Sequence, residues 1–273
     1  MDIEKYRKLC QKNESENYLL DKLIFRKISI YVTILFIKLG IKPNQATFIS
    51  LIAALGSLYF LLFNTTAMLL TASALIFTYY ILDHVDGELA RYYIQTGQMQ
   101  PSLKGHYFDV LVHRYSSNLM VFFMSLSIYN LYGYELAVLL GFLACIGISS
   151  FPNVVAAHVI VGKIANNKNL IFEDAAAQDI LSTLETKSQQ IKDIHHGSTI
   201  QKLKKLIIES LFFPGHVVLL VLILIGDAFL GDFAFLAYPF NLRVVFLLGI
   251  VPLYTLKTVI QSILWLNKFS KVA

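Results

Sequence analysis

The chain is organised as long apolar stretches separated by shorter polar ones. Six stretches have the length of about 20 residues that is needed to cross a hydrocarbon core of roughly 30 Å. They lie at about residues 46–63, 66–82, 107–128, 135–160, 207–230 and 243–266. Backbone N–H and C=O groups must be paired in lipid, so each stretch is expected to be a helix. The pattern therefore predicts an all-α integral membrane protein, a bundle of six transmembrane helices.

Before the first of these stretches, basic and apolar residues alternate at helical spacing. The segment NYLLDKLIFRKISIYVTILFIKLG carries Lys22, Arg26, Lys27 and Lys38. This pattern predicts an N-terminal amphipathic helix lying at the membrane interface, and the four cations argue against the alternative of a further span. The expected division is a cytosolic N-terminus with the interfacial helix at 1–45, a six-span membrane domain at 46–266 and a cytosolic tail at 267–273.

Composition agrees with a membrane protein and suggests its orientation. Of the 273 residues, 56% are hydrophobic and 15% are charged, and mean hydropathy is +0.60, which excludes an ordinary soluble domain. Lysines and arginines gather before the first span and in a polar loop at about 162–205. By the positive-inside rule, both termini and this loop are cytosolic. The net charge of +5 flanks apolar spans, so anionic lipid headgroups are expected as its partner and nucleic acid is not.

An acidic cluster follows directly on the second apolar stretch, in DHVDGELARYY, residues 83–93. Helical offsets of three, four, seven and eight bring five of its residues onto one face. They are Asp83, Asp86, Gly87, Ala90 and Arg91. Two carboxylates on adjacent turns can address one cation, small residues leave room for a bulky ligand, and an arginine suits phosphate oxygens. A solvated helix end just past the membrane is the alternative interpretation.

A second polar cluster opens the third apolar stretch, in KGHYFDVLVHRYSSN. Gly105, Asp109 and His113 are spaced by four and share a helix face. Acids at the cytosolic ends of consecutive spans can converge on one pocket and bind a hard divalent cation through oxygen. A shared cation requires the carboxylates of Asp83 and Asp109 to lie within about 10 Å. The two clusters indicate metal-assisted attack on a phosphoryl group, in which the cation neutralises charge on a departing phosphate.

Together the clusters read D-x-x-D-G-x-x-A-R followed by G-x-x-x-D, and they resemble the signature of the CDP-alcohol phosphotransferases. These membrane enzymes displace CMP from a CDP-alcohol with the hydroxyl of a second alcohol. The segment KLGIKPNQATFISLIAALG is similar to the start of the family's first span, which implies that Asn44 and Thr47 approach the nucleotide. Helix capping is the alternative for both residues. The resemblance covers roughly residues 20–160.

The resemblance implies a role for each matching residue. Mg²⁺ or Mn²⁺ is expected on the CDP diphosphate, held by Asp83, Asp86 and Asp109. Substrate contacts are expected from Gly87, Ala90, Arg91 and Gly105, together with Asn44 and Thr47. A homodimer is implied as well, with a CDP-alcohol donor, a hydroxyl-bearing acceptor and membrane lipid as the other partners.

His113 departs from the family's pattern. The family's last acid, which is assigned as the general base, is a histidine in this chain. A neutral imidazole can accept a proton near pH 7, so we expect His113 to be the catalytic base. A metal ligand and a packing residue are the alternatives for this side chain.

The expected function is a membrane transferase that moves a substituted phosphate from a CDP-alcohol to an acceptor hydroxyl and releases CMP, in the biosynthesis of phospholipids or related glycolipids or polymers. One alternative is a catalytically degenerate relative that binds a CDP-alcohol or lipid without turnover, as the change at His113 suggests. A second is a small ion-coupled transporter. Its acids would lie near mid-span, whereas the acids of this chain fall at the cytosolic ends.

Overall fold

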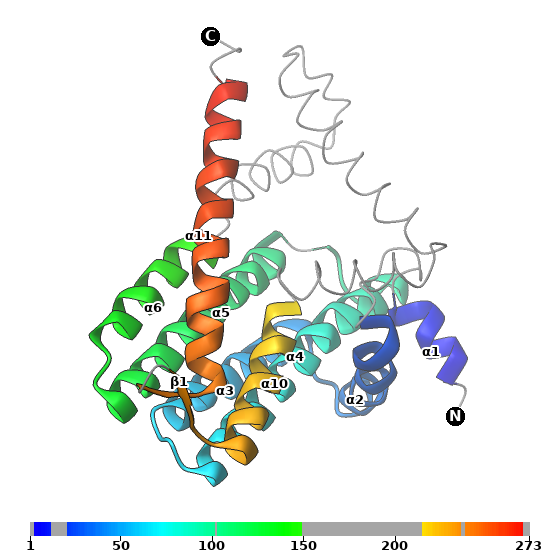
Figure 1. Ribbon diagram of the computed structural model, residues 1–273. Coiled ribbons are helices and arrows are strands. Elements are labelled where there is room, and N and C mark those ends of the chain that lie inside the picture. Colours follow the sequence, from blue (N-terminus) through cyan, green and yellow to red (C-terminus); the bar gives the residue numbers. More distant parts are fainter. Residues whose placement is uncertain (1–2, 12–20, 102, 149–214, 236–237, 270–273) are drawn as a thin grey trace, which may run out of the picture.

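The computed structural model describes residues 3–11, 21–101, 103–148, 215–235 and 238–269, which are mostly helical (Figure 1). The N-terminal elements are α1 (Ile3–Cys10), the short π-helix η2 (Asp21–Phe25) and α2 (Arg26–Lys38). The long helices that follow are α3 (Pro43–Leu61), α4 (Thr66–Gln95), α5 (Leu103–Tyr132), α6 (Glu135–Ile148), α10 (Gly215–Leu230) and α11 (Leu242–Phe269). A two-stranded antiparallel hairpin, β1 (Phe233–Phe235) and β2 (Tyr238–Phe240), joins α10 to α11 and is an addition to the predicted all-α fold.

Each predicted span overlaps a helix of the described residues, and three of these helices are long and apolar enough to cross a membrane. They are Pro43–Leu61, Thr66–Gln95 and Leu242–Ile260. Two shorter apolar helices, Glu135–Ile146 and Gly215–Leu230, cover parts of two further predicted spans. The count of six spans stays a prediction, and the predicted loop at about 162–205 lies outside the described residues.

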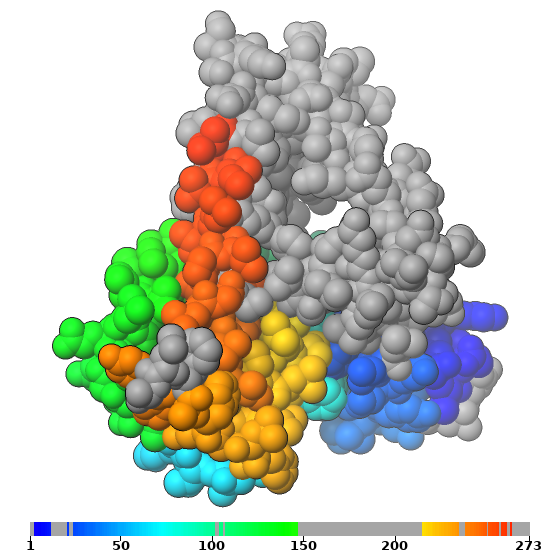
Figure 2. Space-filling view, in the orientation of Figure 1, coloured from blue at the N-terminus to red at the C-terminus, as the bar shows by residue number. Residues whose placement is uncertain are grey.

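Helices α3, α4 and α5 form the centre of the structure, and the remaining long helices pack around them. α3 packs against both α4 and α5, α10 lies on α4, and α6 packs against α5 and α11. In the space-filling view, α11, orange to red, borders both α6, green, and α10, yellow (Figure 2). The α3 face toward its neighbours carries small side chains, including Ala46, Ala54 and Ser57, which allow a close helix approach.

The opposite face of α3 is apolar and exposed. Phe48, Ile52, Leu55 and Tyr59 are each at least half exposed. Contiguous exposed apolar side chains on a helix long enough to span a bilayer are typical of a lipid-facing surface. This face therefore agrees with an integral membrane protein.

Helix α2 occupies most of the segment predicted to be an interfacial helix, and it packs along α4. Its buried face combines Ile30 and Ile34 with the hydroxyls of Ser29 and Thr33. Buried hydroxyls need hydrogen-bond partners, and these two find theirs on α4. The N-terminal segment thus docks on the helix that carries the acidic motif.

The N-terminal end of α4 is fixed by a buried ion pair. Arg243 is 2% exposed, and its Nε donates to Asp227 Oδ2 at 2.5 Å. The same guanidinium donates through Nη1 to Asn64 and Ser127. Because these residues come from four different segments, the pair ties α10 and α11 to the turn before α4 and to α5.

Candidate active site

A cavity of about 760 Å³ opens between α2, α3, α4 and α5, at the C-terminal end of α4. Its wall contains every site residue that the sequence nominated. They are Asn44, Thr47, Asp83, Asp86, Gly87, Ala90, Arg91, Gly105, Asp109 and His113. The structure brings these residues together from three helices, α3, α4 and α5.

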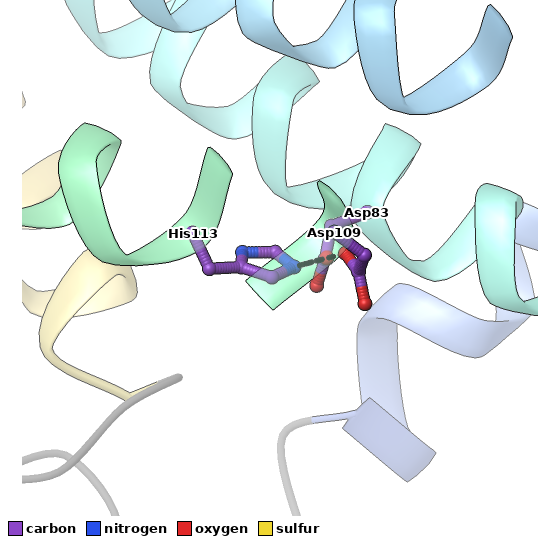
Figure 3. A group of neighbouring side chains, drawn as sticks. All are labelled: Asp83, Asp109 and His113. Atoms are coloured by element: carbon purple, nitrogen blue, oxygen red, sulfur yellow. Dashed lines mark ion pairs between the residues drawn. The ribbon is translucent and has the colours of Figure 1, made fainter. Parts of the chain in front are cut away.

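The most compact group in this cavity is Asp83 with Asp109 and His113 (Figure 3). One ligand atom from each of the three lies within 4.8 Å of the others. His113 Nε2 lies 2.8 Å from Asp109 Oδ1 and also contacts Asp83 Oδ1. The carboxylates of α4 and α5 are therefore close enough to share one cation, well inside the separation of about 10 Å that would exclude it.

The donor set of this group fits a divalent cation. Two carboxylates and an imidazole are all common ligands of divalent metals. Among the described residues, Asp109 Oδ1 has no partner in hydrogen-bonding geometry, although His113 Nε2 is near it. A buried carboxylate oxygen without a well-aligned donor is costly, and a cation would satisfy it.

Asp86 lines the same cavity but is not a member of the compact group found among the described residues. Its side chain is 6% exposed, and its Oδ2 accepts a hydrogen bond of 2.7 Å from Thr47 Oγ1. Thr47 therefore orients the second motif aspartate, a role that sequence reasoning did not consider. Asn44, in the first turn of α3, is exposed and lines the cavity.

Tyr79 is a neighbour of His113 that the sequence did not reveal. It is fully buried on α4, and its hydroxyl lies 2.9 Å from His113 Nδ1. Tyr79 precedes Asp83 by one helical turn, so the offset of four that related the motif residues would have placed it on their face. The sequence pattern did not single out Tyr79, because a tyrosine within an apolar run is typical of a core residue.

His84 joins the acidic cluster to the N-terminal segment. Its Nε2 lies 3.1 Å from Asp21 Oδ1, and its Nδ1 lies 3.6 Å from Asp83 Oδ2. The hydroxyl of Tyr80 donates to the same oxygen of Asp21 at 2.8 Å. The structure places His84 in the cavity wall together with Asp21. No local pattern relates Asp21 to residues 59 or more positions away.

Glu88 holds the N-terminal helices against α4. It is 1% exposed and accepts three hydrogen bonds of 2.6 to 2.9 Å, from Gln11, Ser29 and Thr33. A buried carboxylate that accepts three hydrogen bonds indicates a structural role. Sequence reasoning overlooked Glu88 because its partners lie far away in the chain.

Arg91 is positioned by the end of α1. Its Nε donates to the carbonyl oxygen of Cys10, the last residue of that helix. The two Nη atoms lie beside Gly87, where a Cβ would be 3.5 and 3.6 Å from them. The glycine therefore leaves its space to the guanidinium, which borders the cavity.

Comparison with known families agrees with the two motifs. Residues 41–171 match the family model described as CDP-alcohol phosphatidyltransferase. No curated protein matches the chain. The matched segment includes α3, α4 and α5, whereas Asp21, Arg26 and the partners of Glu88 come from residues before it.

Proposed function

The chain belongs, through residues 41–171, to the CDP-alcohol phosphatidyltransferase family, and we propose that the cavity formed by α2 to α5 is its active site. The observation that carries this proposal is the convergence of Asp83 and Asp109 with His113. The family implies transfer of a phosphatidyl-type group from a CDP-alcohol, in lipid synthesis.

The reaction we propose is a phosphoryl substitution. The acceptor's hydroxyl oxygen forms a bond to the phosphorus that carries the donor's alcohol, and the bond from that phosphorus to the bridging diphosphate oxygen breaks. CMP leaves with the bridging oxygen, and the hydroxyl proton passes to a base. The sequence interpretation offers His113 as this base, with metal ligation as the alternative role for the same side chain.

Asp83, Asp86 and Asp109 are the proposed holders of Mg²⁺ or Mn²⁺. When bound, such a cation supplies charge neutralisation for the donor's diphosphate and for the phosphate that departs. The chain's own contribution is to hold the carboxylates in place. Thr47 fixes Asp86 through its hydroxyl, and His84 lies against the second oxygen of Asp83.

The wall beyond the acids is proposed to receive the nucleotide. Gly87 and Ala90 keep the α4 surface low, and Gly105 does the same at the start of α5. Arg91 is held by the Cys10 carbonyl and turns its Nη groups toward the bare face of Gly87. Its planar fork suits a phosphate oxygen of the donor.

The wider setting is also part of the proposal. The chain is an integral membrane protein by its apolar helices and its family. We propose that the active site and both termini face the cytosol, that six spans cross the membrane, and that the protein is a homodimer. A hydroxyl-bearing acceptor and membrane lipid complete the proposed partners.

A degenerate relative that binds a CDP-alcohol without turnover is the second candidate, and the observation that favours it is His113 in place of an acid. Metal-dependent nucleotide binding without release of CMP would support it. A transporter is disfavoured because Asp83 and Asp86 lie in the second half of a 30-residue helix, toward its C-terminal end, and Asp109 lies near the start of α5.

The test is release of CMP by the purified full chain in the presence of hydroxyl-bearing acceptors. Candidate donors are CDP-diacylglycerol, CDP-choline, CDP-ethanolamine, CDP-glycerol and CDP-ribitol, each with and without Mg²⁺ or Mn²⁺. We expect metal-dependent release from one of them, abolished in Asp86→Asn. Asp232→Asn, an acid at the far end of the bundle, is the matched control and should leave release unchanged. Absence of release from every donor would contradict the proposal.

A further inference from the structure

Both ring nitrogens of His113 face partners, and this arrangement bears on its role. Nε2 points at the carboxylates of Asp83 and Asp109, and Nδ1 lies 2.9 Å from the hydroxyl of Tyr79. A general base needs a nitrogen directed at the acceptor's hydroxyl. A metal ligand instead needs one nitrogen among the other ligands and a second-shell partner on the opposite nitrogen. The contacts of His113 have the second form.

We propose that His113 is a ligand of the divalent cation through Nε2, together with Asp83 and Asp109, and that Tyr79 is a positioning residue that holds the ring. The proposal rests on the proposed function, because the cation is the one that the transfer would use. In this state Nδ1 carries the proton and donates to the Tyr79 oxygen, which fixes the tautomer. The acceptor's proton then goes to another group or to bulk water.

Burial of Tyr79 supports a fixed position for its hydroxyl beside the His113 ring. Tyr79 is fully buried, and its ring centroid lies 6.0 Å from that of His113. The hydroxyl lies within hydrogen-bond distance of Nδ1 in this buried position. Hydrogen bonds of this kind on the outer nitrogen of a ligating histidine typically account for about 10 to 100-fold in metal affinity.

An imidazole ligand changes which metal the site prefers. Mg²⁺ favours oxygen ligands in near-ideal octahedral geometry, whereas imidazole suits first-row transition ions. The imidazole of His113, added to the carboxylates that hold the cation, therefore favours Mn²⁺ over Mg²⁺. One ion per chain is expected, because the described residues contain one compact group of this type.

The experiment uses the full chain in detergent with Mn²⁺ as the probe. Electron paramagnetic resonance counts bound Mn²⁺, and its pulsed form detects coupling to a directly bound imidazole nitrogen. We expect one Mn²⁺ per chain with ¹⁴N coupling, and competition by Mg²⁺ only at higher concentration. His113→Asp should remove the coupling and raise the relative affinity for Mg²⁺. His216→Gln should keep the coupling, since His216 lies on α10 and does not line the cavity.

Tyr79→Phe tests the positioning role. It should weaken Mn²⁺ binding by about 10 to 100-fold while the protein stays folded. Tyr254→Phe is the matched control, because Tyr254 is 6% exposed on α11 and its hydroxyl has no hydrogen-bond partner among the described residues. This control should bind Mn²⁺ as the wild type does.

The outcomes separate this proposal from the proposed function. Mn²⁺ bound without ¹⁴N coupling would overturn the ligand assignment even where CMP is released. Unchanged Mn²⁺ affinity in Tyr79→Phe would overturn the positioning role of Tyr79. Coupling that disappears in His113→Asp supports the assignment even where no CDP-alcohol reacts, and in that case only the transferase function fails.

Discussion

Thr47 Oγ1 donates a hydrogen bond of 2.7 Å to Asp86 Oδ2, across the interface between α3 and α4. Both side chains are buried at the cavity wall. Thr47, in the segment KLGIKPNQATFISLIAALG, therefore orients Asp86, in the acidic cluster. This contact explains why a threonine at the start of α3 belongs to the same site as aspartates about 40 residues later.

Thr47→Val should separate the hydroxyl's contribution from that of side-chain shape. The buried carboxylate loses a donor, and hydrogen bonds to charged groups typically contribute about 1.5–3 kcal/mol to stability. We expect a loss of this size in the free energy of unfolding, measured by chemical denaturation in detergent, together with slower CMP release. Thr47→Ser keeps the hydroxyl and should stay near the wild type. Equal behaviour of the two variants would argue against the contact.

Glu88→Ala should loosen the N-terminal helices from α4. Three buried donors, on Gln11, Ser29 and Thr33, would lose their acceptor, at about 1–3 kcal/mol for each donor that stays unpaired. We expect a lower melting temperature and faster cleavage of the N-terminal segment in limited proteolysis. Glu88→Gln keeps an acceptor oxygen and should show a smaller effect. Unchanged cleavage in Glu88→Ala would show that other contacts hold these helices.

Gly87→Ala should be tolerated by the fold but should weaken donor binding. An added Cβ would lie 3.5 Å from Arg91 Nη1, an ordinary van der Waals distance, so no severe clash follows. It would nevertheless occupy cavity space beside the guanidinium. We expect KM for the CDP-alcohol to rise with little change in melting temperature. Gly249→Ala, where nothing lies within 4 Å of the new Cβ, is the control and should leave KM unchanged.

Cys10 should resist alkylation in the folded protein. Its side chain is fully buried, and burial raises the pKa of the thiol to about 12. Because the thiolate is the reactive form, a raised pKa leaves almost none of it near pH 8. Labelling by a maleimide, read by mass spectrometry, should be slow in the wild type and faster in Glu88→Ala. Fast labelling of the folded wild type would contradict the docking of α1 on α4.

The residues that the sequence singled out line one cavity, whereas the segments that surround this cavity were not predicted. Helical offsets placed Asp83, Asp86 and Arg91 on one face of a helix, and all three line the cavity because α4 continues unbroken to Gln95. The hydropathy pattern placed the end of this span near residue 82, where the first charged side chains appear. The helix itself continues beyond them to Gln95. Local periodicity gives the face of one helix and says little about which distant segment covers it.

The contacts that the sequence did not predict join residues far apart in the chain. Asp21 meets His84, and Gln11 meets Glu88, across 63 and 77 positions. Tyr79 lay within reach of the spacing argument, but an aromatic residue in an apolar run carries no polar signal of its own. No pattern in the sequence indicates that Asp21 of η2 and Arg26 of α2 line the cavity.

Donor and acceptor can be followed together by ³¹P NMR, with the full chain, a reactive CDP-alcohol and its acceptor. We expect CMP and a new phosphodiester to appear in equal amounts, and both to disappear in Asp83→Asn and on addition of a chelator. CMP formed without the phosphodiester would indicate hydrolysis. Turnover that survives in Asp83→Asn would contradict the assignment of this cavity as the metal-dependent active site.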